Sequence, residues 1–302
     1  MKKFTLFSGT RRCAKRAFTL IEIMVATAIM VILVGLVIQI TSQVLNVWTR
    51  SSGRLSALAS ARVAMELITQ DLETAVFRNN GMQWLRAENE ELSAAGGTTN
   101  TVALQLFSPA LDRPEGPGDI CAIGYNLRFA DPVTGEESGD DRLFVLYRKI
   151  INAETTFNDL MGVGNQEDLT SWGNWSSGGG ADGAGPDNST SINSDDYLVS
   201  NIASFEIKFH VEDDGDPDSS TLVEGDTIFG GTGSTVGAGA VAASEERYRK
   251  PLAYADIRLT VLSDEGASVL QNLEATGKTL DEVLLEYSKV FYRRLYFPSR
   301  PI

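Results

Sequence analysis

A long apolar run near the N-terminus dominates the hydropathy pattern of the chain. Between residues 18 and 40 the sequence reads FTLIEIMVATAIMVILVGLVIQI, and Glu22 is its one charged residue. About 20 apolar residues let a helix cross the hydrocarbon of a bilayer, so the run predicts a transmembrane helix over residues 18–41. A secretory signal would have a shorter apolar region and a small-x-small cleavage site after it.

Beyond this run, apolar residues recur every three or four positions, which is the period of a helix with one apolar face. They are Leu55, Leu58, Ala61, Met65, Ile68, Leu72 and Ala75. The spacing predicts that the helix continues as an amphipathic segment over residues 42–80. Gly53 is a candidate bend and Gly81 a candidate end, because glycine weakens a helix at either place.

Five segments further along alternate or cluster apolar residues in the manner of β-strands. They cover residues 101–107, 120–129, 143–148, 202–211 and 255–262. A long helix followed by such strands predicts an α+β fold, in which an antiparallel β-sheet covers the apolar stripe of the helix. We therefore expect residues 81–302 to form one head.

Two stretches rich in Gly, Ser and Asp interrupt the strands, at residues 152–196 and 212–246. They contain too few apolar residues to order themselves, so we interpret them as long insertions in the head. Trp172 and Trp175 are candidates for contacts between the first insertion and the head.

The C-terminal segment begins with a capping box, in which Thr279 precedes Glu282 by three positions. Apolar residues at helical spacing continue as far as Phe291, which predicts a late amphipathic helix. Residues 292–296 read YRRLY and form the main basic patch after residue 17. This patch could dock a partner, but we favour a terminal strand whose arginines pair with local carboxylates.

The charge distribution predicts which side of a membrane each part occupies. Six basic residues precede Phe18, although the whole chain carries a net charge of −14. Basic flanks of a transmembrane helix stay in the cytoplasm, so we expect the head in the periplasm. Without those six residues the net charge would be about −20, and such an acidic surface repels phosphate backbones and argues against nucleic acid as a partner.

The sequence offers little of the chemistry that an enzyme needs. The one histidine, His210, lies in an alternating strand segment, where a structural role is more common. Gly231, Thr232 and Gly233 lack the spacing and the lysine of a phosphate-binding loop. Aspartates between residues 213 and 218 lack the glycine and glutamate of a calcium loop. We expect no enzyme activity, cofactor or metal site, with calcium at these aspartates as the open alternative to solvated charge.

The first residues of the apolar run and those before it form a recognisable motif. Residues 15–22, KRAFTLIE, followed by IMVATAIMVILVGLV, resemble the cleavage and methylation segment of type IV pilins and type II secretion pseudopilins. The resemblance implies that a prepilin peptidase cuts between Ala17 and Phe18, removes residues 1–17 as a leader and methylates the new amine. It also implies that Glu22 pairs with the Phe18 amine of a neighbouring subunit. Ala17 stands where the family usually has glycine.

This resemblance implies a function in assembly. The chain would be a structural, minor subunit of a type II secretion pseudopilus or a type IV pilus-like filament, held in the inner membrane by a single span. Its partners would be prepilin peptidase and other pilin-like subunits. The alternative is a membrane-tethered binding or adhesion module that does not polymerise, and a tethered hydrolase is a third hypothesis.

The order of segments in the head has a looser resemblance to a known group. A strand carrying Tyr147 and Arg148 is followed by VSNIASFEIKFHV and then by KPLAYADIRLTVL. This order resembles the heads of minor pseudopilins of the J type in pattern alone, with longer insertions.

Overall fold

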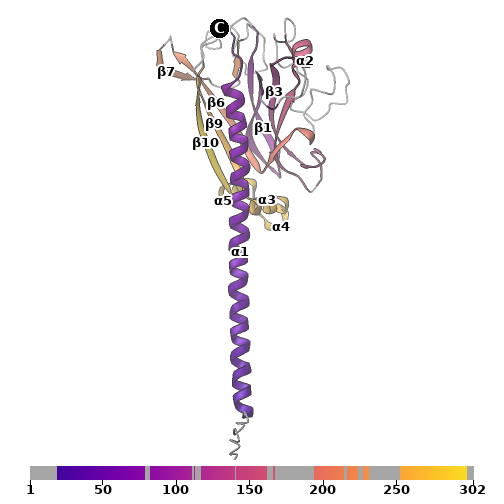
Figure 1. The fold of residues 1–302 in the computed structure, drawn as a ribbon, viewed down its shortest axis with the longest axis vertical. Helices are drawn as coiled ribbons and strands as arrows, with labels where there is room; N and C mark the ends of the chain where they lie inside the picture. Colours follow the sequence, from indigo (N-terminus) through magenta and orange to yellow (C-terminus); the bar gives the residue numbers. More distant parts are fainter. Residues whose placement is uncertain are drawn as a thin grey trace, which may run out of the picture. The chain divides into compact units, whose positions relative to one another are not determined.

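The computed structural model of the chain contains one long helix, short helices and many strands (Figure 1). It describes residues 19–78, 82–110, 112, 117–139, 141–161, 166, 194–213, 216–223, 227–230 and 252–297. The chain divides into two compact units, Met1–Ser51 and Ser52–Ile302. Helix α1 (Leu20–Glu73) contributes to both of them.

In the first unit, α1 is exposed from its first turn to Ser51. The helix is long and apolar enough to cross a membrane, and none of its most apolar window is buried. Hydroxyl groups within this part donate to backbone carbonyls one turn earlier, as Thr41 does to Val37 at 2.8 Å and Ser42 to Ile38 at 2.9 Å. From Leu20 to Ile38 the exposed side chains are apolar apart from Glu22 and Thr27, and polar residues are frequent only from Gln39 onward.

In the second unit, α1 buries one face, which confirms the predicted amphipathic stripe. Its buried residues are Ala57, Ala61, Ala64, Met65, Ile68, Thr69, Asp71 and Leu72. The helix passes through Gly53 without a break and ends at Glu73, before the predicted end at residue 80. It ends early because the chain then joins the sheet: the Val76 amide donates to the Phe107 carbonyl at 2.8 Å, and the Thr74 and Ser108 hydroxyls lie 2.6 Å apart.

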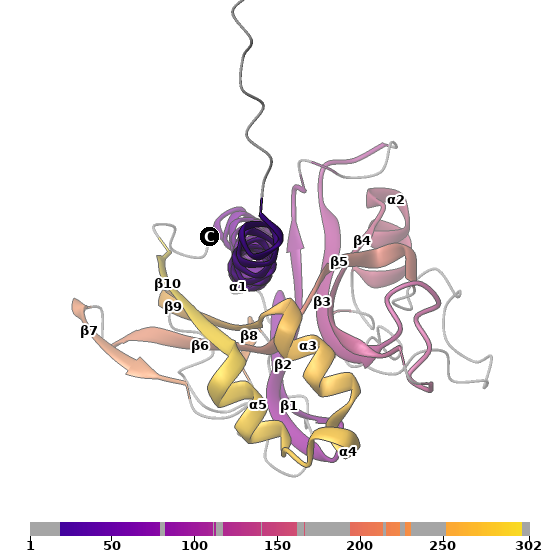
Figure 2. The same ribbon diagram turned by 90° about the horizontal axis from the view of Figure 1, so that it is seen from below.

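The head contains a ten-stranded sheet with the order β10-β9-β6-β2-β3-β4-β5, to which β1, β7 and β8 add at the sides. Its strands are β1 (Leu85–Ala94), β2 (Gly97–Ser108), β3 (Cys121–Ala130), β4 (Leu143–Ile151), β5 (Tyr197–Ser200), β6 (Ile202–Asp213), β7 (Asp216–Leu222), β8 (Thr227–Phe229), β9 (Leu252–Leu262) and β10 (Ser288–Tyr296). Figure 2 shows the sheet curled, with β9 and β10 at one end and β4 and β5 at the other. The predicted α+β class is confirmed.

The sheet is mixed, so the expectation of a purely antiparallel sheet was wrong in one place. β2 and β6 pair in parallel through Thr101 and Phe205, while the other pairings are antiparallel. A hairpin turn would impose antiparallel pairing, but β3, β4 and β5 separate β2 from β6 along the chain. Side chains supplement this short contact: Thr99 Oγ1 donates to the Ala203 carbonyl at 2.9 Å, and Ser204 Oγ donates to that of Asn100 at 2.8 Å.

The main core lies between the buried stripe of α1 and the sheet. It includes Ile68 and Leu72 of α1 and large side chains from both halves of the sheet, among them Leu104, Phe205 and Ile257. Each of these five residues has 0% of its surface exposed. Because apolar burial is the main favourable term in folding, this layer fixes the outer part of α1 to the head.

The C-terminal segment differs from the predicted helix. Helix α5 (Leu280–Tyr287) begins with the predicted capping box between Thr279 and Glu282. It ends at Tyr287, and Phe291 lies instead in the middle of β10, which pairs with β9. The favoured alternative, a terminal strand with a paired arginine, is therefore confirmed. The helical spacing failed because Phe291 and Leu295 also alternate along a strand, and both pack toward the core.

Several elements have no counterpart among the predicted segments. They are β1, β5, β7, β8, α2 (Ala153–Thr155), the π-helical turn η1 (Thr156–Leu160), the 3-10 turn η3 (Ser194–Asp196), α3 (Asp264–Gln271) and α4 (Leu273–Thr276). Parts of both predicted insertions are thus ordered, and β8 pairs with β1. The leader, Phe18, Trp172, Trp175 and residues 231–233 lie outside the described residues.

Candidate functional site

The first candidate site is the beginning of α1, where Glu22 lies in the first turn. The Thr19 side-chain oxygen accepts a hydrogen bond from the Glu22 amide at 3.4 Å, so Thr19 caps the helix. A carboxylate in the first turn is favourable because the amides there carry partial positive charge. Ala17 and Phe18, on either side of the predicted cut, lie outside the described residues.

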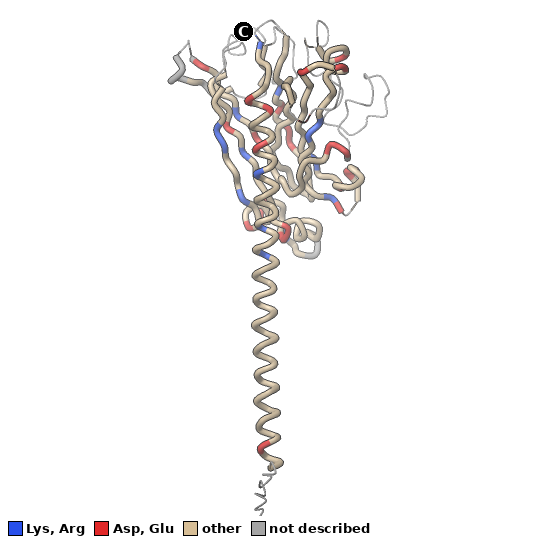
Figure 3. Tube along the Cα trace, viewed as in Figure 1, with Lys and Arg blue, Asp and Glu red and all other residues tan. Residues whose placement is uncertain are grey.

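Glu22 is isolated along the apolar part of the helix. Residues 23–49 carry no charge, and Arg50 is the next charged residue of α1. In Figure 3 this uncharged part of the helix is an uninterrupted tan tube. A lone carboxylate on an apolar rod costs a few kcal/mol in lipid, and an ammonium group close to it removes most of that cost. The arrangement therefore suits a charge partner from outside the helix.

The second candidate site is a buried charge cluster around Arg148 of β4. Its Nε lies 2.8 Å from Asp71 Oδ2 and its Nη2 lies 3.0 Å from Oδ1, which makes a bidentate pair with α1. The other side of the guanidinium binds Asp112, with Nη1 2.6 Å from Oδ2 and Nη2 3.0 Å from Oδ1. Tyr125 of β3 donates to Asp71 and accepts a hydrogen bond from Arg148 Nε at 3.0 Å.

The electrostatics of this cluster favour the ionised pair. Burial lowers the pKa of Arg148, but the hydrogen bonds to Asp71 and Asp112 outweigh it, and the pKa lies above its ordinary value. The hydrogen bond from Arg148 lowers the pKa of Asp112. Burial, reinforced by the charge of Asp71, raises the pKa of Tyr125, which keeps its hydroxyl protonated as a donor. The cluster is a fixed link between α1 and the sheet.

The sequence analysis singled out Arg148 but missed its partners. Asp71 falls on the apolar stripe of α1, between the buried residues Ile68 and Leu72. A charged residue on the buried face of a helix is a signal for a buried partner, since an unpaired charge there is costly. The signal does not identify the partner, which lies 77 positions away.

A third group of polar residues lies on the outer face of β6, β9 and β10. Asp256 accepts hydrogen bonds from Arg294 Nε at 2.7 Å and from the Tyr292 hydroxyl at 2.6 Å, and the Arg294 bond lowers the pKa of Asp256. His210 Nε2 lies 3.8 Å from the same carboxylate, and its ring stacks on Tyr254 at 4.2 Å. Burial lowers the pKa of His210. These contacts give His210 and the basic C-terminal patch structural roles.

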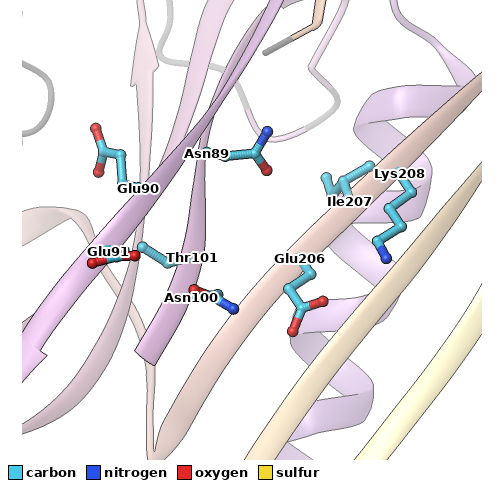
Figure 4. A pocket seen from close by; sticks show the side chains of 8 residues that line it. All are labelled: Asn89, Glu90, Glu91, Asn100, Thr101, Glu206, Ile207 and Lys208. Atoms are coloured by element: carbon cyan, nitrogen blue, oxygen red, sulfur yellow. The ribbon is translucent and has the colours of Figure 1, made fainter. Parts of the chain in front are cut away.

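A cavity of about 380 Å³ is lined by residues of β1, β2 and β6 (Figure 4). Its lining residues are Asn89, Glu90, Glu91, Asn100, Thr101, Glu206, Ile207 and Lys208. Three carboxylates and one ammonium give it an acidic character, but the lining contains neither a histidine nor a cysteine. Within the described parts of the chain, no three His, Cys, Asp or Glu side chains gather in a way that could hold a metal ion.

Comparison with known proteins bears on the first site. The family model described as the prokaryotic N-terminal methylation motif matches residues 12–38. No curated protein and no solved structure matches the chain. The matched segment contains the end of the predicted leader, Ala17, Phe18, Glu22 and the first part of α1.

This motif indicates processing and assembly of the pilin kind, and the proteins that carry it are structural and not enzymatic. It also fits anchoring of the chain by one membrane span. The fold agrees, with a long N-terminal apolar helix followed by a curled, mixed β-sheet head. The N-terminal segment of the chain, residues 12–38, is therefore like that of type IV pilins and pseudopilins.

Proposed function

We propose that this chain is a minor structural subunit of a type II secretion pseudopilus or a type IV pilus-like filament. The observation that carries the proposal is Glu22, the one charged residue between Phe18 and Arg50, which lies four residues after Phe18 and inside the matched motif. An anchor alone needs no such carboxylate. A subunit that meets the N-terminal amine of a neighbour does need it.

Processing begins on the cytoplasmic side of the membrane, because the positive charge of the leader keeps it in the cytoplasm. A prepilin peptidase cuts between Ala17 and Phe18 and methylates the Phe18 amine. In the assembled filament that amine meets Glu22 of an adjacent subunit. Each group is costly to bury alone, whereas the pair is far less so, which fixes the vertical register between subunits.

The head completes the assembly function in the periplasm. The core beneath α1 and the buried Arg148–Asp71 pair fix the outer part of the helix to the sheet. The helices of neighbouring subunits would associate through the exposed apolar surface of residues 20–38. The order of segments along the head sequence, which resembles minor pseudopilins of the J type, supports a minor subunit, and the inserted strands β7 and β8 would offer surfaces for other subunits.

The experiment that tests this function is co-expression of the full chain with a prepilin peptidase, followed by mass spectrometry of the protein from membranes. We expect loss of the 17-residue leader and one added methyl group on Phe18. A catalytically inactive peptidase is the control and should leave the leader attached. A leader that persists with the active peptidase would overturn the proposal.

The second candidate function is a membrane-tethered binding or adhesion module that does not polymerise. The acidic cavity between β1, β2 and β6 is the feature of the head that favours it. Cross-linking in cells that contain the complete assembly machinery separates the two. A filament subunit cross-links to other pilin-like chains through α1, whereas a tethered module does not.

A further inference from the structure

The exposed apolar surface of α1 continues past the segment that the sequence predicted to cross the membrane. After Ile40 come four large apolar residues with exposed surfaces of 51–68%: Val44 60%, Leu45 51%, Val47 68% and Trp48 68%. If the membrane ended after Ile40, all four side chains would face water, because no other part of the first unit covers this part of the helix. A membrane that extends to Trp48 would bury them.

The length of the helix agrees with the second placement. From Glu22 to Trp48 the helix rises about 39 Å, at about 1.5 Å per residue. A bilayer with its headgroup regions is about 40–45 Å thick, and its hydrocarbon is about 30 Å thick. Glu22 and Trp48 can therefore occupy the two interfaces at the same time, with Gly35 at the middle of the bilayer.

The hydroxyl groups inside the longer span are hydrogen-bonded, and its side-chain amides, those of Gln39, Gln43 and Asn46, all lie in its outer part. The Thr41 and Ser42 hydroxyls bond to carbonyls of the previous turn, and the Thr27 hydroxyl bonds to the Met24 carbonyl at 3.0 Å. A hydroxyl that is already hydrogen-bonded costs much less to place in lipid than an unpaired one. No residue between Glu22 and Arg50 is charged.

We propose that Trp48 is a membrane-interface anchor that binds the headgroup region of the periplasmic leaflet before the subunit enters a filament. The indole ring combines a large apolar body with one N–H donor, which is the reason why tryptophan concentrates at membrane interfaces. Arg50, two residues later, marks the water side. This inference rests on the proposed function in one respect, since it takes α1 as the membrane span.

The anchor has a consequence for the other end of the helix. Because α1 is continuous from Leu20 to Ser51, fixing Trp48 in one interface fixes the depth of Glu22 in the other. The unassembled subunit then holds its predicted cleavage position at the cytoplasmic surface and does not slide further into the lipid.

Cysteine accessibility measures the position of the outer boundary directly. The full chain, with Cys13→Ser and Cys121→Ala, would be expressed with prepilin peptidase but without other pilin-like subunits. Single cysteines at Ile40, Val44 or Ser51 are then labelled in spheroplasts with a membrane-impermeant maleimide. We expect Ser51→Cys to react about tenfold faster than the other two. Equal labelling of Val44→Cys and Ser51→Cys would overturn the proposed boundary.

The role of the indole is tested in the Val44→Cys reporter. Trp48→Ala should raise the labelling rate of that cysteine by about tenfold, and Trp48→Tyr should restore protection, because tyrosine is also an interfacial residue. Leu45→Ala is the matched control, since it removes a neighbouring exposed apolar side chain without a polar tip. An unchanged rate in Trp48→Ala, or an equal rise in Leu45→Ala, would overturn the anchor.

The same samples distinguish this inference from the proposed function. Mass spectrometry reports whether the leader has been removed, and the labelling rates report the membrane boundary. A retained leader with a protected Val44→Cys would contradict filament processing and support the anchor. A removed leader with a fully labelled Val44→Cys would support filament processing and contradict the anchor.

Discussion

Arg148 on β4 and Asp71 on α1 form a bidentate ion pair with N–O distances of 2.8 and 3.0 Å. Only 6% and 4% of the two side chains are exposed. The pair joins the helix to the sheet at a depth where an unpaired charge is costly, so it specifies one position of α1 on the head. Tyr125 adds a third element, β3, to the same contact.

Replacement of Asp71 by Asn should destabilise the head. The variant keeps the shape of the side chain but leaves the Arg148 guanidinium with one charged partner, Asp112. Breaking one side of a buried ion pair costs about 3 kcal/mol in the free energy of unfolding. Urea denaturation of the full chain in detergent, followed by tryptophan fluorescence, would measure the loss.

Asp112→Asn is the matched control for that variant. The Asp112 side chain is 55% exposed, so its ion pair with Arg148 is screened by water. We expect a loss of less than about 1 kcal/mol, because exposed ion pairs contribute little. If the two variants lost the same stability, burial of the Asp71 pair would not be the reason for its contribution.

The sequence predicted those parts of the molecule that depend on neighbouring residues. The apolar stripe of α1, the capping box of Thr279 and the segment around Glu22 are all patterns within a few turns of helix, and local spacing determines them. The candidate site at Glu22 was therefore accessible to sequence reasoning. The amine that we propose as its partner belongs to another molecule.

Contacts between distant segments could not be predicted in this way. β1 reads LRAENEELSA, and its many polar residues gave no strand pattern in the sequence. In the structure it pairs with β2 along its whole length. The partners of Arg148 lie 77 and 36 positions away, so no local pattern links them. The parallel contact of β2 with β6 likewise depends on the path of three intervening strands.

The pH dependence of stability just below about pH 6.5 should depend on His210, the one histidine of the chain. Burial lowers its pKa from 6.5, and Arg294 and Lys208 act in the same direction against the opposing charge of Asp256. The unfolded chain therefore binds a proton at higher pH than the folded chain. The free energy of unfolding is therefore highest above about pH 6.5, and it decreases as the pH falls from 6.5 through the lowered pKa of the folded chain.

His210→Gln should flatten this part of the stability profile. The variant has no titrating group at the position, while glutamine retains hydrogen-bonding capacity near Asp256. Thermal unfolding of the full chain in detergent at a series of pH values would show the slope. An unchanged decline of stability just below pH 6.5 would mean that carboxylates elsewhere cause it.

Gly230 should tolerate no side chain, because its backbone and its surroundings both require glycine. Its φ is +91°, and an added Cβ would lie 2.5 Å from the Met82 carbonyl oxygen and 2.7 Å from that of Arg78. We expect Gly230→Ala to lower the free energy of unfolding by about 3 kcal/mol or more, from strain and overpacking together. Urea denaturation would measure it.

Gly96→Ala separates the two causes. Gly96 also has a positive φ, +78°, but no atom lies within 4 Å of an added Cβ. The substitution then carries only the backbone penalty of about 1–2 kcal/mol. Equal losses at the two positions would show that the close approach of the Met82 and Arg78 carbonyls to Gly230 contributes nothing.

The assembly function makes its sharpest prediction at Glu22. Glu22→Val should leave membrane insertion and cleavage unchanged, since the anchor becomes more apolar and the cut site is intact. It should lower incorporation into filaments by about tenfold or more, because the Phe18 amine of the neighbouring subunit loses its charge partner. Glu22→Asp keeps the charge on a shorter side chain and should fall between valine and the native residue. Co-expression with native subunits, shearing and immunoblotting of the filament and membrane fractions would give the ratio; incorporation of the valine variant at the native level would exclude Glu22 as the group that sets the register.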